Sequence, residues 1–213
     1  MLVKKLSPKG LVPVLLLSIC VVIALYLMNR PTFQTPVGGD LQGVLRPEAR
    51  ELTAFTLIDQ NNQSFELDRF DGRWSFVFFG YTYCPDICPT TLAKLVSVFS
   101  KLEKQGESSK SLNAFFVSVD PQRDKPEVLN GYMSYFNKAF IGVTGKKEQI
   151  DSFARQFGAG YVIEPEREPG DYLVSHTSSI FLVGPKKRLW AHFSPPHDAE
   201  TIAEQFRKIK ALY

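Results

Sequence analysis

The sequence predicts an α/β fold in which helices flank a central mixed β-sheet, with one N-terminal transmembrane helix in front of that domain. Three observations predict it. Apolar residues fill positions 11–28, a second apolar run at 74–79 has the composition of a buried strand, and helix-like and strand-like segments alternate from there onward. Because such alternation builds parallel crossovers, the sheet is expected to carry helices on both faces.

Length and charge limit the chain to one main domain. The 213 residues, 44% of them hydrophobic, suffice for one well-filled core and a short accessory segment. Four of the 25 basic residues lie among the first thirty residues, which contain no acid, so the remainder has 21 basic residues against 22 acids. A nearly neutral domain excludes a nucleic-acid surface. Only two of the three cysteines lie outside the first apolar run, and they form either one bridge or one site.

Residues 1–10 are expected to lie in the cytoplasm and residues 11–28 to cross the membrane. At about 1.5 Å of rise per residue, the apolar run nearly spans a hydrocarbon core of roughly 30 Å. Three lysines precede the run and a single arginine follows it, which favours export of everything after residue 30. No small-x-small cleavage site follows, so we expect an uncleaved anchor in which Cys20 is a lipid-facing or packing residue.

Residues 29–50 have the proline and glycine content of an irregular tether, and the folded domain is expected to occupy residues 51–213. Its first elements are predicted to be a β-hairpin, in which 55–58 and 64–67 flank a polar turn. The run at 74–79 then forms a strand, and its continuous apolar composition is typical of a strand covered on both faces.

The segment after the two domain cysteines predicts one amphipathic helix. Apolar residues recur at helical spacing from Leu92 to Leu102, and Gly106 follows where a C-terminal cap is expected. Residues 112–119 are rich in aromatic and β-branched types and are predicted to form a strand. Strand, helix and strand therefore form a right-handed parallel crossover.

Two further helices are predicted in the second half of the domain. Pro126 is placed as the first residue of a helix that runs to about residue 137, since its missing N–H costs nothing there. Thr144 is expected to cap the next helix, which ends at Gly158.

The C-terminal segment predicts a second hairpin and a last helix. Residues 180–183 and 189–193 form the hairpin, and Asp198 caps the helix. The order of hairpin, strand, helix, strand, two helices, hairpin and helix is that of a thioredoxin-like fold.

Two cysteines at a strand-to-helix turn are the most informative feature of the sequence. Cys84 and Cys88 lie between the predicted strand and a helix that Pro89 is expected to begin. The unpaired N–H groups and positive dipole end of a helix favour a thiolate, which is the form that binds soft metals or attacks a disulfide. Folded as a helical turn, this spacing puts the two side chains about 5–6 Å apart at Cβ, which suits two ligands of one ion or, with modest adjustment, a disulfide. The spacing by itself leaves metal binding and redox chemistry open.

Three stretches of sequence carry a resemblance to a known family. They are residues 79–92, 117–129 and 171–183, which read FGYTYCPDICPTTL, VSVDPQRDKPEVL and DYLVSHTSSIFLV. In this order they resemble the SCO1/SenC family, and the resemblance covers nearly all of residues 52–210.

The resemblance implies copper binding. In that family two cysteines and a downstream histidine bind copper, which carries over to Cys84, Cys88 and His176 as the metal ligands. Two thiolates and one imidazole suit Cu(I) and can also hold Cu(II), so the implied cofactor is copper in either or both states. Tyr83 stands where some members have histidine, so any auxiliary role of that histidine is absent here.

The resemblance also implies a role in assembling the binuclear copper centre of cytochrome c oxidase. Family members deliver copper to that centre or keep its cysteines reduced, so the chain is expected to be a metallochaperone, and a thiol-disulfide reductase with Cys84 and Cys88 as its redox-active pair is the alternative. Residues 177–179 lack the cis-proline that oxidoreductases of this fold usually carry there, which favours the chaperone. A thiol peroxidase is disfavoured because the strand after Ser179 supplies no arginine.

The implied partners follow from that function. They are the copper-binding subunit of cytochrome c oxidase and an exported thiol reductant or copper donor. The N-terminus lacks the arginine-rich amphipathic pattern of a mitochondrial transit peptide. We therefore expect a single-pass protein of the inner (cytoplasmic) bacterial membrane, with its domain facing the periplasm.

Four other polar features are given simpler interpretations. His192 and His197 are expected to be surface residues, and Asp86 to be solvated. Residues 120–124 are expected to form a turn with helix-entry capping and an Asp–Arg pair, and in the resembled family this loop flanks the copper site.

Overall fold

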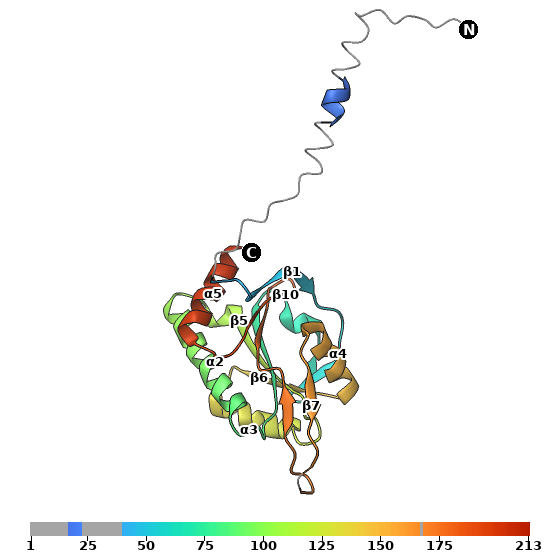
Figure 1. The fold of residues 1–213 in the computed structure, drawn as a ribbon. Coiled ribbons are helices and arrows are strands. Elements are labelled where there is room, and N and C mark those ends of the chain that lie inside the picture. The colour runs from blue at the N-terminus through green and yellow to red at the C-terminus, as the bar shows by residue number, and fades with distance from the viewer. Residues whose placement is uncertain (1–16, 23–39, 167) are drawn as a thin grey trace, which may run out of the picture. The chain divides into compact units, whose positions relative to one another are not determined.

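The computed structural model describes residues 17–22, 40–166 and 168–213 (Figure 1). Residues 17–22 are helical, and Gly38–Tyr213 forms a structural unit of its own. Most of the predicted anchor, the cytoplasmic segment and the first part of the tether lie outside the described residues. Among the described residues, no helix combines the length and the apolar character needed to cross a membrane.

A mixed eight-stranded sheet forms the centre of the domain, with the strand order β1-β10-β9-β4-β5-β6-β2-β3. The β4–β5 and β5–β6 pairs are parallel and the other pairs are antiparallel. The strands are β1 (Leu45–Glu51), β2 (Leu57–Asp59), β3 (Ser64–Phe65), β4 (Trp74–Gly80), β5 (Leu112–Ser118), β6 (Ile141–Thr144), β9 (Ile180–Val183) and β10 (Arg188–Phe193). A separate two-stranded sheet pairs β7 (Tyr161–Ile163) with β8 (Val174–His176).

Helices cover both faces of the large sheet, with α2, α3 and α5 on one side in Figure 1 and α4 on the other. The alternation along β4 accounts for this, because Phe76 contacts Phe99 of α2 and Phe206 of α5, whereas Phe79 contacts Phe153 of α4. The helices are α2 (Ile87–Lys104), α3 (Pro126–Phe136), α4 (Lys147–Phe157) and α5 (Ala199–Ala211), with 3-10 turns at Leu67–Phe70 and Ser109–Ser111. The predicted α/β, thioredoxin-like arrangement is confirmed.

Most of the predicted element boundaries are confirmed. β4, α2 and β5 form the parallel crossover. Pro126 is the first residue of α3, and Gly158 caps α4 with a left-handed φ of 72°. The side chain of Asp198 accepts the N–H of Thr201 at the start of α5.

The expected tether is wrong in its last part, because residues 45–50 belong to β1. This strand pairs with β10, and Leu41 before it is buried. β1 is an edge strand whose sequence, LRPEARE, is mostly charged and contains a proline. Such composition protects an exposed edge from pairing with other chains, and it also hides the strand from a search for apolar alternation.

The expected cap at Thr144 is also wrong. Thr144 is the last residue of β6 and is buried, while α4 begins at Lys147 without a side-chain cap. A four-residue strand is too short to show a period-2 pattern, so the sequence analysis missed β6. The helix after the cysteines likewise begins at Ile87, before the expected Pro89.

Candidate metal centre

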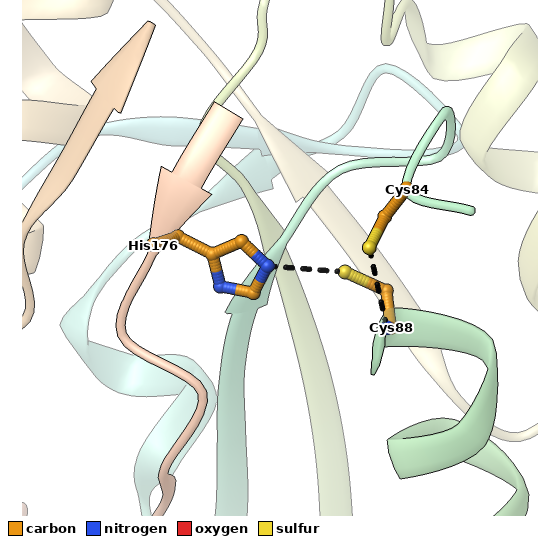
Figure 2. A group of neighbouring side chains, drawn as sticks. All are labelled: Cys84, Cys88 and His176. Atoms are coloured by element: carbon orange, nitrogen blue, oxygen red, sulfur yellow. Dashed lines mark hydrogen bonds between the residues drawn. The ribbon is translucent and has the colours of Figure 1, made fainter. Parts of the chain in front are cut away.

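Three elements bring the implied ligands together. Cys84 lies in the loop after β4, Cys88 lies in the first turn of α2, and His176 ends β8. The two Sγ atoms and a ring nitrogen of His176 all lie within 4.8 Å of one another (Figure 2). The fold therefore brings His176, which lies 88 residues after Cys88 in the sequence, next to the two cysteines.

The start of α2 fixes the relation between the two cysteines. The backbone N–H of Cys88 donates to Sγ of Cys84 over 3.5 Å. The sulfur thereby takes the place of an N-cap acceptor, because the side chain of Asp86 makes no capping bond and is exposed, as expected. Cys84 sits at the positive end of the helix dipole, where a thiolate is favoured.

Gly80 makes room for the sulfur of Cys88. Cys88 is completely buried, and a Cβ at position 80 would lie 2.7 Å from its Sγ and 2.8 Å from the ring of Phe116. No real Cβ tolerates such contacts, so the glycine at the end of β4 lets this sulfur lie directly against the strand.

The imidazole of His176 is already oriented for a metal. Its Nδ1 lies 3.1 Å from the carbonyl oxygen of Thr177, which can only accept, so Nδ1 carries the proton. Nε2 is then left with a free lone pair, and it lies 3.3 Å from Sγ of Cys88 (Figure 2). The rings of Phe78 and Tyr81 pack edge-on against the imidazole with centroids 5.9 and 6.0 Å away. Such contacts hold a ligating ring in place before the ion arrives.

The two thiols differ strongly in acidity. The hydrogen bond from Cys88 lowers the pKa of Cys84 to about 3, and backbone N–H groups act in the same direction. Cys88 donates this hydrogen bond from its thiol, and the donation together with burial raises the pKa of Cys88. The metal-free site therefore holds one thiolate and one thiol, and an ion that takes both sulfurs as ligands must displace the proton of Cys88.

A buried carboxylate anchors the loop that carries Cys84. Asp124 accepts the N–H and the O–H of Thr82, at 3.0 and 2.5 Å, and the O–H of Ser118 at 2.6 Å. Burial raises the pKa of Asp124, while these hydrogen bonds act in the opposite direction. The sequence analysis did not find this anchor. The Asp–Arg pair expected in this turn is confirmed as Asp120–Arg123, whereas the expected helix-entry cap is wrong, because α3 begins after Lys125 without a side-chain cap.

The other two histidines are not brought to the centre, and the expectation that they are surface residues is wrong. His192 and His197 are both half-buried, and burial lowers the pKa of each. Nε2 of His197 donates to the carbonyl oxygen of Ser178 over 2.9 Å.

Comparison with known proteins places this geometry in a family context. The family model described as SCO1/SenC matches residues 44–211. A protein of Stutzerimonas stutzeri is 40% identical over 153 residues, which cover 72% of this chain and 74% of the relative. A SCO2-like protein of Rickettsia prowazekii is 33% identical over 186 residues, which cover 86% of this chain and 89% of the relative. The crystal structure of Arabidopsis thaliana ScoI with copper bound has a TM-score of 0.71 and 31% identity, and the alignment covers 76% of this chain and 98% of that one.

Proposed function

This chain belongs to the SCO1/SenC family, and on that premise we propose that it is a copper chaperone that binds copper through Cys84, Cys88 and His176. The observation that carries the proposal is the meeting of two sulfurs and a bare imidazole nitrogen within 4.8 Å. Thiolate ligands select soft ions such as Cu(I), and the same N and S donors can hold Cu(II). The copper-bound ScoI of Arabidopsis, which shares the fold, supports the choice of metal.

Copper is the cargo of this site, and its exposure suits ligand exchange. Cys84 is half-buried, whereas Cys88 is fully buried. A thiolate of a recipient protein can therefore approach an ion from the side of Cys84, while Cys88 and His176 still hold it. In this scheme exchange begins at Cys84.

The recipient is the binuclear copper centre of cytochrome c oxidase, through its copper-binding subunit. Family membership supports this role. Residues 11–28 anchor the chain in the inner membrane with the domain in the periplasm, as the apolar run and its flanking lysines indicate. An exported reductant or copper donor keeps the cysteines reduced and supplies the ion.

A thiol-disulfide reductase is the second candidate, because the two cysteines are free and the pKa of Cys84 is lowered to about 3. A low-pKa thiolate next to a second thiol is the arrangement that reduces disulfides. This reaction requires both sulfurs but not the imidazole.

One set of variants separates the two functions. The reduced full chain and its Cys84→Ser, Cys88→Ser and His176→Ala variants are titrated with Cu(I) against a chromophoric chelator, with His192→Gln as a control outside the site. A chaperone loses tight binding in all three site variants and keeps it in the control. Reduction of a disulfide-bonded peptide from the oxidase subunit is then measured in parallel. Unchanged copper binding by His176→Ala, with full reductase activity, would overturn the chaperone in favour of the reductase.

A further inference from the structure

One arginine contacts both of the segments that carry the proposed copper ligands. The guanidinium carbon of Arg123 lies 3.6 Å from the ring centroid of Tyr172 and 4.9 Å from that of Tyr83. Tyr83 directly precedes Cys84, and Tyr172 lies on the segment that leads into β8 and His176. The arginine itself comes from neither segment, because it belongs to the turn between β5 and α3.

The guanidinium is held in place by buried partners. Its Nε donates to Asp120, and the other oxygen of Asp120 accepts the O–H of Tyr172 at 2.7 Å. Asp120 is completely buried, and the side chain of Arg123 is only 14% exposed. Among the described residues, Nη2 of Arg123 is buried without a hydrogen-bond acceptor. The guanidinium is therefore stabilised in part by aromatic faces, including that of Tyr81, whose ring centroid lies 5.6 Å from its central carbon.

The two aromatic contacts are unequal. Tyr172 is buried, with 4% of its surface exposed, whereas Tyr83 is 61% exposed. The contact with Tyr172 is thus part of the packed domain, and the contact with Tyr83 lies at the surface, where it can open without disturbing the core. The exposed half of this arrangement lies next to Cys84, the half-buried ligand.

We propose that Arg123 is a positioning residue that holds Cys84 at binding distance from His176, by stacking between Tyr83 and Tyr172. Opening of the Tyr83 contact lets Cys84 leave the ion and so sets the rate at which copper is passed on. This inference rests on the proposed function. Asp124 fixes Thr82 from the same turn, so residues 82 and 83, which directly precede Cys84, are both held from one side.

The test removes the exposed ring without touching the buried ion pair. The full chain is loaded with Cu(I), and its transfer to excess bathocuproine disulfonate is followed by stopped flow. Loss of a surface cation–π contact in Tyr83→Leu is expected to speed transfer about tenfold, and the conservative Tyr83→Phe, which keeps the ring, to stay within about twofold of the parent. Tyr135→Leu, at a tyrosine that is 84% exposed, controls for the loss of a surface aromatic side chain. Equal rates in Tyr83→Leu and the parent would overturn the proposal.

A second variant assigns the effect to the arginine. Arg123→Met alone would leave Asp120 as a buried unpaired charge, so it is combined with Asp120→Asn. In that background Tyr83→Leu should have no further effect on transfer, and an undiminished effect would overturn the role of Arg123.

A copper-free measurement separates this inference from the proposed function. Alkylation of Cys84 by iodoacetamide in the metal-free chain should be faster in Tyr83→Leu than in the parent and Tyr83→Phe, because the loop is released. If the parent binds no copper, the chaperone function fails, and the alkylation rates still decide whether the stacking positions Cys84. Identical alkylation in all three proteins would contradict the positioning role.

Discussion

Cys84 and Cys88 are chemically unequal although they lie in one site. The thiol of Cys88 and the N–H groups at the start of α2 stabilise the thiolate of Cys84, whereas the hydrogen bond to Cys84 and burial keep Cys88 protonated. A reduced, metal-free site of this kind carries one negative charge instead of two. It thereby avoids the repulsion of two adjacent thiolates while one ligand is already ionised.

This difference predicts how the stability of the reduced, metal-free chain depends on pH. The pKa of Cys84 is about 3 in the folded chain against an ordinary 9.0, so between these values the unfolded chain binds a proton that the folded chain does not. The contribution of Cys84 to the stability of the folded chain is therefore complete above its ordinary pKa of 9.0, and it is lost as the pH falls through its folded pKa of about 3. We expect the urea midpoint to rise more steeply between about pH 5 and about pH 8 in the parent than in Cys84→Ser. Equal slopes would contradict the lowered pKa of Cys84.

Gly80→Ala tests the packing beneath Cys88. The new methyl group would lie 2.7 Å from the sulfur, so Cys88 or the strand must shift. Overpacking of this kind costs about 1–3 kcal/mol of unfolding free energy, and we expect copper affinity to fall at least about tenfold. Gly131→Ala in α3 is the control, because a Cβ there meets nothing within 4 Å and the change favours the helix. Parent-like affinity in Gly80→Ala would show that the position of this sulfur is not critical.

At the scale of elements, the cysteine turn could be predicted from sequence and the histidine strand could not. A continuous apolar run predicts β4, and apolar residues at helical spacing predict α2; both are local sequence signals. β7 and β8 have three residues each, and β7 is largely exposed, so no periodicity marks them. The position of His176 depends on their pairing, and only the resemblance of its motif pointed to it.

The turn between β5 and α3 is an element whose function the sequence analysis left unassigned. Its residue Asp124 accepts three hydrogen bonds, two of them from Thr82 in the cysteine loop. A charged residue inside a motif does not reveal whether it is buried, because that depends on which loop packs against it.

Asp124→Asn tests this anchor. An amide presents one oxygen and two N–H groups, so it cannot accept all three donors without turning an N–H toward another donor. We expect a loss of about 1–3 kcal/mol in the free energy of unfolding, together with weaker copper binding. Asp71→Asn, whose side chain is 57% exposed, is the matched control. Unchanged stability and affinity, measured by urea unfolding and chelator competition, would exclude the anchor.

At the scale of the whole molecule, the structure moves the start of the domain toward the N-terminus. β1 covers the edge of β10, Leu41 is buried, and Asp40 contacts Gln205 and Lys208 of α5. Apolar patterning identified β4 because this strand is buried on both faces, and it missed β1 because that edge strand is mostly charged and exposed.

Two fragments test this boundary. A fragment that begins at residue 38 retains β1, whereas one that begins at residue 51 loses it and exposes the edge of β10. We expect the shorter fragment to be less stable by about 2–4 kcal/mol, since it loses a buried leucine as well as strand pairing. Identical urea midpoints for the two fragments would show that residues 38–50 do not stabilise the domain.

The central claim is that one imidazole and two sulfurs bind the same copper ion. Copper K-edge X-ray absorption of the Cu(I)-loaded full chain tests it most directly, because scattering from sulfur and nitrogen neighbours can be distinguished. We predict two sulfur ligands and one nitrogen ligand in the parent, and loss of the nitrogen in His176→Ala. The same spectrum in the parent and in His176→Ala would contradict the account.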